Sequence, residues 1–310
     1  MVQTVLEQVI ILFFMMMVGF FLGKRRYVDR KGTNLLSKLL LDVFFPCNVL
    51  AAASGDFGSM AFGQMIGIIF FYIFCFLLYT FLSGLLSKLL RLKQDDELVF
   101  TRSVSYPNNG FVGIPLCTAI FGAQGSVVAA LSVPCTALYM LFGVMQSFQR
   151  REKTNKDFIQ AKDIATTVNF ATLAMLVMVV NDWRFSGFIL HFLNGFGNCV
   201  LPTSMLIIGC LLSEGHLIDA LKNPLIYLIT FLRGIAAPLL AALLLRFSGW
   251  DHGICLPIVA VLGCSVATVV SIFAVRYDRS PMLASQSVLQ SNLLLPVTMP
   301  VVMMLAEKIV

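Results

Sequence analysis

Residues Ser105–Leu116, SYPNNGFVGIPL, interrupt a hydrophobic segment with prolines, glycines and two adjacent asparagines. Pro107 removes a backbone donor and crowds the preceding turn, and Gly110 weakens helical order further. The side chains of Asn108 and Asn109 are polar groups that hydrocarbon cannot satisfy. Irregular backbone at membrane depth occurs only where it is buried in protein or lines a water-filled cavity. The stretch therefore predicts a broken membrane helix that faces a binding site, with a kink used only for packing as the alternative.

The composition is that of an integral membrane protein. Of 310 residues, 58% are hydrophobic and 12% are charged, whereas soluble proteins carry about 25% charged residues. The apolar runs are continuous and lack the alternation of a barrel strand, so we expect helices. The net charge of +6 is better explained by loop placement than by nucleic-acid binding.

The sequence shows no enzymatic motif and no motif for a cofactor or metal. It contains no HExxH, no GxSxG and no Walker loop, so we expect neither an enzyme nor an ATPase. The eight cysteines lie in or at the ends of apolar segments, and none forms a CxxC pair. They are therefore expected to be small buried hydrophobes rather than metal ligands or disulfides.

Ten segments are of the roughly 20-residue length that a bilayer requires, which predicts an all-α membrane protein of ten spans. The expected spans are residues 4–23, 33–53, 63–89, 98–121, 126–147, 163–181, 188–212, 220–246, 254–275 and 282–305.

Loop charges predict the orientation of these spans. Lys and Arg concentrate in the loops after the odd-numbered spans, whereas the other side holds only Arg184, Arg246 and Lys308. Cytoplasmic loops carry the positive excess. Both termini are therefore expected outside, and the lipid bilayer is the expected surrounding of the chain.

The two halves, residues 1–155 and 156–310, repeat weakly. A shift of 156 places Pro46 on Pro202, each in the second span of its half. Five spans per half is an odd number, so the second copy must enter the membrane from the opposite side. This parity predicts inverted repeats, an architecture common in secondary transporters. The broken fourth span should then meet and cross the ninth.

The ninth span supplies small and polar residues at the expected meeting point. Gly263 would allow close approach of the two helices, and Ser265 and Thr268 are candidates for lining a site. The alternative for both hydroxyls is a hydrogen bond to their own helix.

Asp42 and Arg233 are ionisable residues placed far from the membrane interfaces. Such residues normally face the protein interior. Arg233 could attract an anion and Asp42 could carry a coupling proton; alternatively they pair with each other or with the backbone. Further polar candidates at mid-depth are Asn48, Ser204, Gln290 and Asn292.

Four motifs resemble the auxin efflux carrier family, whose bacterial members include organic-acid permeases. They are NNGFVGIPL at 108–116, FGAQGSVVAA at 121–130, LPTSMLIIGCLLS at 201–213 and VLQSNLLLPVTMP at 288–300. The family is similar in fold to the bile-acid/sodium symporters. The resemblance implies two inverted five-helix repeats, a scaffold of spans 1, 2, 6 and 7, and an elevator-like transport domain of spans 3–5 and 8–10. Family members usually carry a proline in the ninth-span break, and its absence here predicts a milder second break.

Together these features predict a secondary active or facilitative transporter of a small organic anion, a mono- or dicarboxylate, in a bacterial cytoplasmic membrane. Its substrate would be held by Pro107, Asn108, Asn109, Gly110, Ser265 and Thr268. H⁺ or Na⁺ is the expected coupling ion, and the resemblance implies a homodimer. A non-transporting receptor or regulatory subunit that binds a carboxylate is one alternative, and a sodium-coupled symporter for an amphipathic anion is another.

Overall fold

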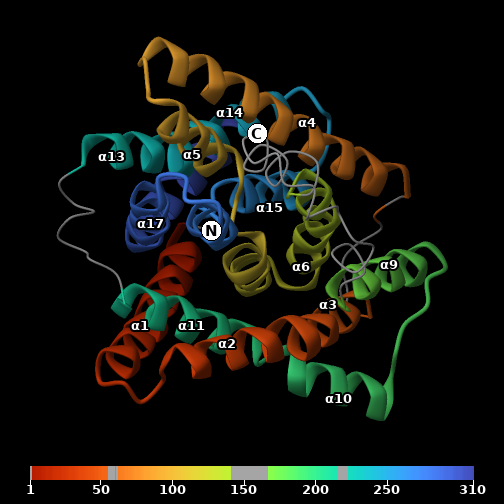
Figure 1. Ribbon diagram of the computed structural model, residues 1–310. Helices are drawn as coiled ribbons and strands as arrows, with labels where there is room; N and C mark the ends of the chain where they lie inside the picture. The colour runs from red at the N-terminus through yellow and green to blue at the C-terminus, as the bar shows by residue number, and fades with distance from the viewer. Residues whose placement is uncertain (1, 55–59, 61, 141–166, 215–222) are drawn as a thin grey trace, which may run out of the picture.

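The computed structural model describes residues 2–54, 60, 62–140, 167–214 and 223–310, and these residues form helices joined by short connections (Figure 1). The first half contains α1 (Val2–Lys24), α2 (Arg30–Leu39), η1 (Leu40–Phe44), α3 (Phe45–Ala53), α4 (Phe62–Leu89), α5 (Gln94–Ser105), η2 (Asn109–Gly113) and α6 (Ile114–Tyr139). The second half contains α9 (Thr167–Val180), α10 (Gly187–Gly197), α11 (Val200–Glu214), α13 (Pro224–Phe231), η4 (Leu232–Ala236), α14 (Ala237–Leu245), α15 (His252–Leu262), α16 (Thr268–Arg276) and α17 (Pro281–Ile309).

The all-helical class expected from the sequence is confirmed in the described residues, which contain no strand. Six helical stretches are long and apolar enough to cross a membrane, and three shorter apolar helices accompany them. The count of ten spans and their inverted arrangement stay predictions. The expected sixth span begins within residues 141–166, and the eighth begins within 215–222, both outside the described residues.

Helix α4 shows why the outside of the molecule suits lipid. Phe70, Phe74, Leu77, Phe81 and Leu85 are all exposed and recur every three or four residues along it. Residues at this spacing share one face of a helix. A continuous apolar face turned outward is the pattern expected where a helix contacts hydrocarbon.

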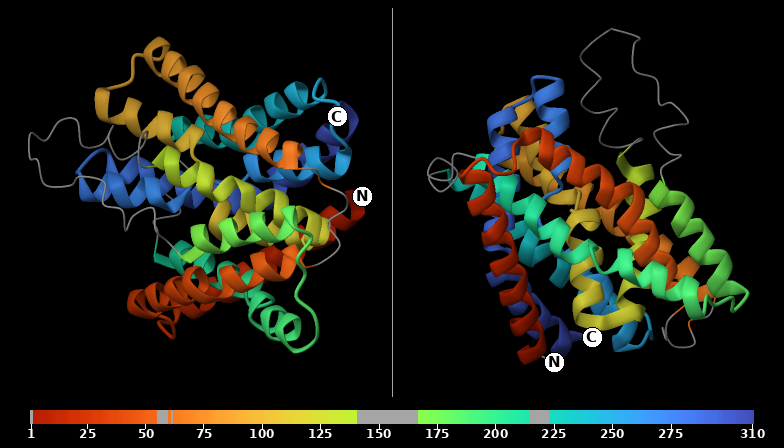
Figure 2. Two further views of the ribbon diagram at one scale, coloured as in Figure 1. Left: turned by 90° about the vertical axis from the view of Figure 1, so that its right-hand side faces the viewer. Right: turned by 90° about the horizontal axis from the view of Figure 1, so that it is seen from below.

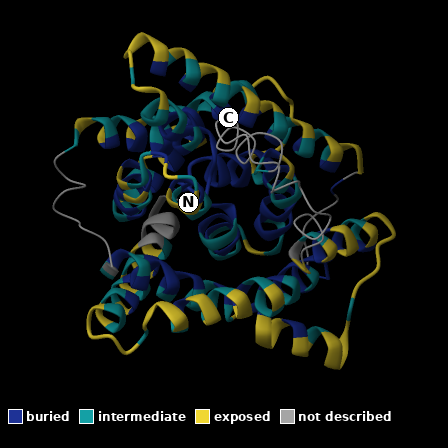
Figure 3. Cartoon of the chain, in the orientation of Figure 1, coloured by how far each residue is buried: buried dark blue, intermediate teal, exposed yellow. Residues whose placement is uncertain are grey.

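The most deeply buried helices lie in the middle of the molecule. Every residue of α15 from Ile254 to Leu262 is buried, and it packs against α6. Figure 3 shows buried residues gathered on these central helices and exposed residues on peripheral ones such as α4 and α10. Figure 2 shows α4 on the opposite side of the molecule from α2 and α10. Central segments are therefore the ones that can hold a site away from lipid.

Helices α1 and α11 approach each other more closely than side chains would allow. A Cβ atom added at Gly19 would lie 2.4 Å from the carbonyl oxygen of Leu206, and one at Gly209 would lie 2.0 Å from that of Met16. The thiol of Cys210 donates to the carbonyl oxygen of Gly19 (3.3 Å). Glycines let helix backbones touch in this way. We call this pairing the α1–α11 contact.

Three short π-helical turns share one relation to proline. η1, η2 and η4 are each followed by one residue and then by Pro46, Pro115 or Pro238. A proline ring clashes with the carbonyl four residues earlier, and a wider turn relieves that clash. Proline alone does not produce the turn, because Pro257 lies inside the regular helix α15.

One glycine separates two helical runs within α6. Gly122 has φ 62° and ψ −145°, a non-helical conformation that disfavours any other residue. The chain therefore changes direction here, between the expected fourth and fifth spans.

Candidate functional site

Two breaks in helices from opposite halves of the chain lie against each other. α5 ends at Ser105 and η2 begins at Asn109, while α15 ends at Leu262 and α16 begins at Thr268. The intervening segments form an antiparallel bridge between Pro107 and Val266. We call residues 106–109 and 263–268 the crossover. The meeting of these two segments is the arrangement expected from the sequence.

Backbone hydrogen bonds join the two segments on both sides of the bridge. The Asn108 N–H donates to the carbonyl of Ser265 (2.9 Å), and the Ala267 N–H donates to the carbonyl of Tyr106 (3.1 Å). Groups that helix interruption would leave unpaired thus find partners 157 and 161 residues away in the sequence (265 − 108 and 267 − 106). This satisfaction is what permits irregular backbone inside a membrane protein.

Arg233 binds the carboxyl-terminal ends of both interrupted helices. Its side chain is fully buried. Nε donates to the carbonyl of Cys264 (3.0 Å), one terminal nitrogen donates to Val104 (3.0 Å), and the other donates to Leu262. Helix carboxyl ends carry negative partial charge. Arg233 therefore pairs with backbone carbonyls, which was one of the alternatives expected from the sequence. Its guanidinium bonds to the helix ends at both breaks.

The second break is longer than the missing proline led us to expect. Residues 263–267 lie outside any helix, so the prediction of a milder break is wrong. The reason is that other elements take up the freed groups. Arg233 donates to this segment, and the Ala267 N–H donates to the carbonyl of Tyr106. In addition, the Val266 N–H donates to Oγ of Ser291 on α17 (3.0 Å). Hydrogen bonds to other helices therefore stabilise the break in the ninth span, although the break contains no proline.

Asn108 and Asn109 each keep one polar atom without a partner. Oδ1 of Asn108 caps η2 by accepting from the Phe111 N–H (3.4 Å), and Nδ2 of Asn109 donates to Oγ of Ser132 (2.7 Å). Nδ2 of Asn108 and Oδ1 of Asn109 are buried and make no hydrogen bond. Gly110 beside them faces open space, because nothing lies within 4 Å of an added Cβ. The predicted cluster therefore combines unpaired polar atoms with room beside them.

Ser265 of the ninth span bonds to α17. Oγ of Ser265 donates to Oδ1 of Asn292 (2.8 Å), whose Nδ2 donates to its own helix at Val288 (2.8 Å). Thr268 begins α16 and is half-buried. Gln290 accepts from Oγ1 of Thr230 (3.1 Å), and its Nε2 is buried without a partner. Of the two α17 candidates, Asn292 therefore bonds to the crossover, while Gln290 bonds to α13.

Asn48 and Ser204 have partners elsewhere. Nδ2 of Asn48 donates to the carbonyl of Gly197 on α10 (3.4 Å), and its Oδ1 accepts from Ser126 on α6 (3.1 Å). The Ser204 hydroxyl donates to the carbonyl of Leu201 in its own helix (2.9 Å). Asn48 therefore links α3 to α6, while Ser204 has the local bond typical of helical serines.

Asp42 was expected to face the protein interior, and this expectation is wrong because its side chain is exposed. It lies in η1, is exposed, and accepts a hydrogen bond from Oγ1 of Thr167 (3.3 Å). The wider turn before Pro46 changes the direction of the side chains after Leu40 relative to a regular helix. A helical count along the sequence could not include that rotation.

The π-turns are the part of the site that sequence reasoning missed. Asp42, Asn109 and Arg233 each lie within one of the three turns. Such turns often occur at functional sites. The signal available in the sequence was a proline two residues after the end of each turn, although Pro257 shows that this signal is not sufficient.

Two helix amino termini also meet at the crossover. η2, which continues into α6, begins at Asn109, and α16 begins at Thr268. The first N–H groups of a helix lack intrahelical partners and carry positive partial charge. Since Arg233 binds the negative ends of α5 and α15, the crossover is left with the positive ends of two helices.

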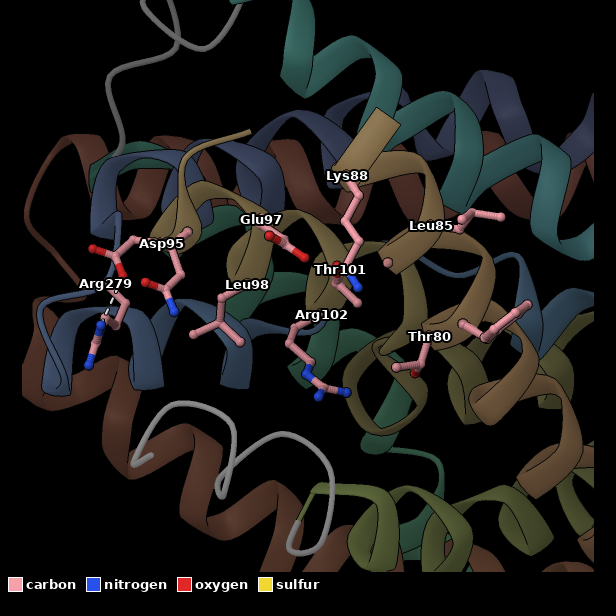
Figure 4. Close-up of a pocket in the computed structure, with 12 residues that line it drawn as sticks. Thr80, Leu85, Lys88, Asp95, Glu97, Leu98, Thr101, Arg102 and Arg279 are labelled. Carbon is pink, nitrogen blue, oxygen red and sulfur yellow. Dashed lines mark hydrogen bonds and ion pairs between the residues drawn. The ribbon is translucent and has the colours of Figure 1, made fainter. Parts of the chain in front are cut away.

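A separate cavity of about 580 Å³ opens between α4 and α5. Figure 4 shows Lys88 and Arg102 among its lining residues and the ion pair between Arg279 and Asp95 (2.9 Å) at one end. Arg102 also donates to the hydroxyl of Tyr139 (2.7 Å). No pattern in the sequence indicates this cavity, because its lining comes from two helices and the α16–α17 connection.

The comparison with known families decides the class of the protein. A family model described as membrane transport protein matches residues 4–169, more than half of the chain. The chain belongs to this family. It is the auxin efflux carrier family that the four motifs resemble, so this is a multi-pass membrane transport protein. No curated protein matches the chain. The matched residues, 4–169, contain the first break, while the second break and Arg233 lie beyond them.

Proposed function

We propose that the chain is a secondary active or facilitative transporter of a small organic anion, a mono- or dicarboxylate, which binds at the crossover. The observation that carries this proposal is the division of charge there. Arg233 covers the negative ends of α5 and α15, while the positive ends of η2 and α16 remain for a ligand. Helix amino termini are well suited to binding anions.

The polar side chains support the same site. Nδ2 of Asn108 and Nε2 of Gln290 are buried donors without a partner. A carboxylate has only acceptor atoms and could receive hydrogen bonds from such donors. Asn109, Ser265 and Thr268 would complete the binding site.

We further propose that the helices work as two bodies in an elevator-type movement within two inverted five-helix repeats. Helix packing supports the composition of each body, while α17 also packs on α1 and α6 on α3 across the proposed boundary. α1 packs on α11, and α3 packs on α9 and α10, which would form the scaffold. α5, α13 and α16 all pack on α17, which would belong to the moving body. A bacterial cytoplasmic membrane, termini outside and a homodimer through the scaffold belong to the same proposal.

Thermal melting of the purified protein with a panel of small carboxylates tests the site. A ligand that binds the folded state raises the melting temperature by mass action. We expect at least one carboxylate to do so, and Asn109→Ala should abolish this shift and uptake into liposomes while the protein still elutes as a single folded species. Repeating the panel with and without Na⁺ and at two pH values identifies the coupling ion.

Two outcomes would contradict the transport proposal. Normal uptake by Asn109→Ala would remove the crossover from the substrate route. Saturable binding of a carboxylate without any flux in liposomes would instead favour a receptor or regulatory subunit.

A further inference from the structure

The cavity between α4 and α5 is separate from the crossover, because none of its described lining residues belongs to 106–109 or 263–268. Its volume of about 580 Å³ lies within the range of about 300–1,000 Å³ that is usual for small-molecule sites. Charged side chains from α4, α5 and the α16–α17 connection line it together with apolar side chains of α4 (Figure 4). Such a lining suits a ligand that has both a charged and an apolar part.

The apolar part of the lining belongs to the outward face of α4. Phe81 and Leu85 line the cavity, and they are also 68% and 60% exposed. They continue the row of exposed residues that includes Phe74 and Leu77, which is the face suited to contact with hydrocarbon. The cavity therefore adjoins the surface that lipid would cover, and a ligand in it can keep apolar chains against α4.

The charged part of the lining has a surplus of one positive charge. Arg279 is neutralised by Asp95, to which it donates at 2.9 Å. The other charged lining residues are Lys88, Arg102 and Glu97, two cations against one carboxylate. A group with one net negative charge complements this set.

Lys88 places this charge at the end of a membrane-spanning helix. It is exposed and lies in the last turn of α4, which ends at Leu89. The loop that follows is one of those rich in Lys and Arg, so the sequence predicts that this end of α4 faces the cytoplasm. Phospholipid headgroups lie at that depth, and the cytoplasmic leaflet exposes anionic ones.

Arg102 is held in position by Tyr139 on α6. Its guanidinium donates to the Tyr139 hydroxyl (2.7 Å) and lies 5.7 Å from the centre of the ring. The hydroxyls of Thr80 and Ser105 also hydrogen-bond to that hydroxyl. A guanidinium is a planar fork with five N–H donors, so an arginine that bonds to a tyrosine can also bond to a phosphate. The orientation of Arg102 is therefore set before any ligand arrives.

We propose that this cavity binds the headgroup of an anionic phospholipid. The phosphate accepts hydrogen bonds from Arg102 and Lys88, and the acyl chains lie on the apolar face of α4 at Phe81 and Leu85. Basic pockets between membrane helices recognise headgroups in this way. Glu97 suits a phosphoglycerol headgroup, whose hydroxyls donate to a carboxylate. This lipid site is separate from the proposed substrate site and does not depend on it.

Native mass spectrometry of the full chain in detergent tests the proposal. The protein is titrated with phosphatidylglycerol, phosphatidylethanolamine and phosphatidylcholine that carry identical acyl chains. Phosphatidylglycerol should bind at least about fivefold more tightly than either zwitterionic lipid, because one basic group near a lipid surface contributes about that factor. Glycerol 3-phosphate carries the same phosphate without acyl chains, and at equimolar concentration it should not displace phosphatidylglycerol.

Three variants distinguish the cavity from general attraction between lipid and a basic surface. Lys88→Gln should weaken phosphatidylglycerol binding about fivefold. Lys24→Gln is the matched control, because Lys24 is exposed in the last turn of α1 and does not line the cavity. Gly84→Leu fills the cavity without removing a charge, since Gly84 lines it and nothing lies within 4 Å of an added Cβ. It should also weaken binding at least about fivefold, and thermal melting shows whether each variant is folded.

Three results would overturn the proposal. Equal affinity for phosphatidylglycerol and a zwitterionic lipid would show that net negative charge is not recognised. An equal loss of binding in Lys24→Gln and Lys88→Gln, with no loss in Gly84→Leu, would show general attraction to the surface instead of a site. Displacement of the lipid by equimolar glycerol 3-phosphate would assign the cavity to a soluble phosphate compound.

Discussion

The α1–α11 contact and the crossover both bring backbones from distant parts of the chain together, and they do so by opposite means. In the first, Gly19 and Gly209 remove side chains so that two unbroken helices touch. In the second, helices are interrupted, and their freed groups bond across the bridge between Pro107 and Val266. Intact helices keep their hydrogen bonds internal. The first region should therefore be sensitive to added volume, and the second to the loss of polar partners.

The largest effect is expected at the crossover from Arg233→Met. This change leaves the buried carbonyls of Val104, Leu262 and Cys264 without their donor. Unpaired buried groups cost about 1–3 kcal/mol each, so the free energy of unfolding should fall by about 3 kcal/mol or more. Denaturant unfolding in detergent measures it, and Arg246→Met, at an exposed position in the same span, should change little. Equal stability of both variants would mean that the crossover does not depend on this arginine.

The α1–α11 contact should respond to a single methyl group. Gly209→Ala places Cβ 2.0 Å from the Met16 carbonyl oxygen, so the helices must separate. Overpacking of this kind costs about 1–3 kcal/mol. Gly84→Ala on α4 is the matched control, because nothing lies within 4 Å of the added atom. A melting temperature for Gly209→Ala as high as that of the control would contradict the close approach.

A pair of serines one turn apart on α17 sharpens the comparison. Ser291→Ala removes the acceptor of the Val266 N–H, whereas Ser287→Ala removes only a bond to its own helix at Leu283. Both side chains are buried. Ser291→Ala should destabilise the protein by about 1 kcal/mol more than Ser287→Ala, measured by thermal melting under identical conditions. The reverse order would show that the second break does not rely on α17.

The smallest effect is expected from Asp42→Asn, which lies outside both regions. Asp42 is exposed and accepts one hydrogen bond from Thr167. Substitutions at such positions usually change stability by less than about 0.5 kcal/mol. If H⁺ is the coupling ion, uptake by this variant should keep its dependence on pH, because Asp42 lies in η1, outside the crossover. Loss of that dependence would make Asp42 the coupling group instead.

The sequence predicted the features that single residues impose locally. Pro107 and the glycines after it indicated the first break, and continuous apolar runs indicated where helices lie. It also placed the second break opposite the first, through the parity of the two halves. These inferences hold because a proline or a hydrophobic run acts on its own neighbourhood.

Features that depend on distant partners were not predictable in the same way. The length of the second break depends on Arg233 and Ser291. The residues around 264 give no sign that these two distant side chains bond to them. Asn48 resembled a site residue in sequence, yet its partners are Gly197 and Ser126. The spacing of Gly19 and Gly23 was a usable signal for close helix packing, but its partner Gly209 becomes evident only in three dimensions.

The three π-turns affect how mutational and evolutionary data on this chain should be read. Each turn holds one residue more than a regular helical turn, and one residue corresponds to about 100° of rotation around a helix. A helical wheel drawn through Leu40–Phe44, Asn109–Gly113 or Leu232–Ala236 therefore assigns the wrong face to every position beyond the turn. Substitution scans of these three spans should be phased separately on each side of the turn. Deleting one residue from a turn, so that it becomes a regular helical turn, would leave the following half of the span in nearly the same orientation relative to the preceding half.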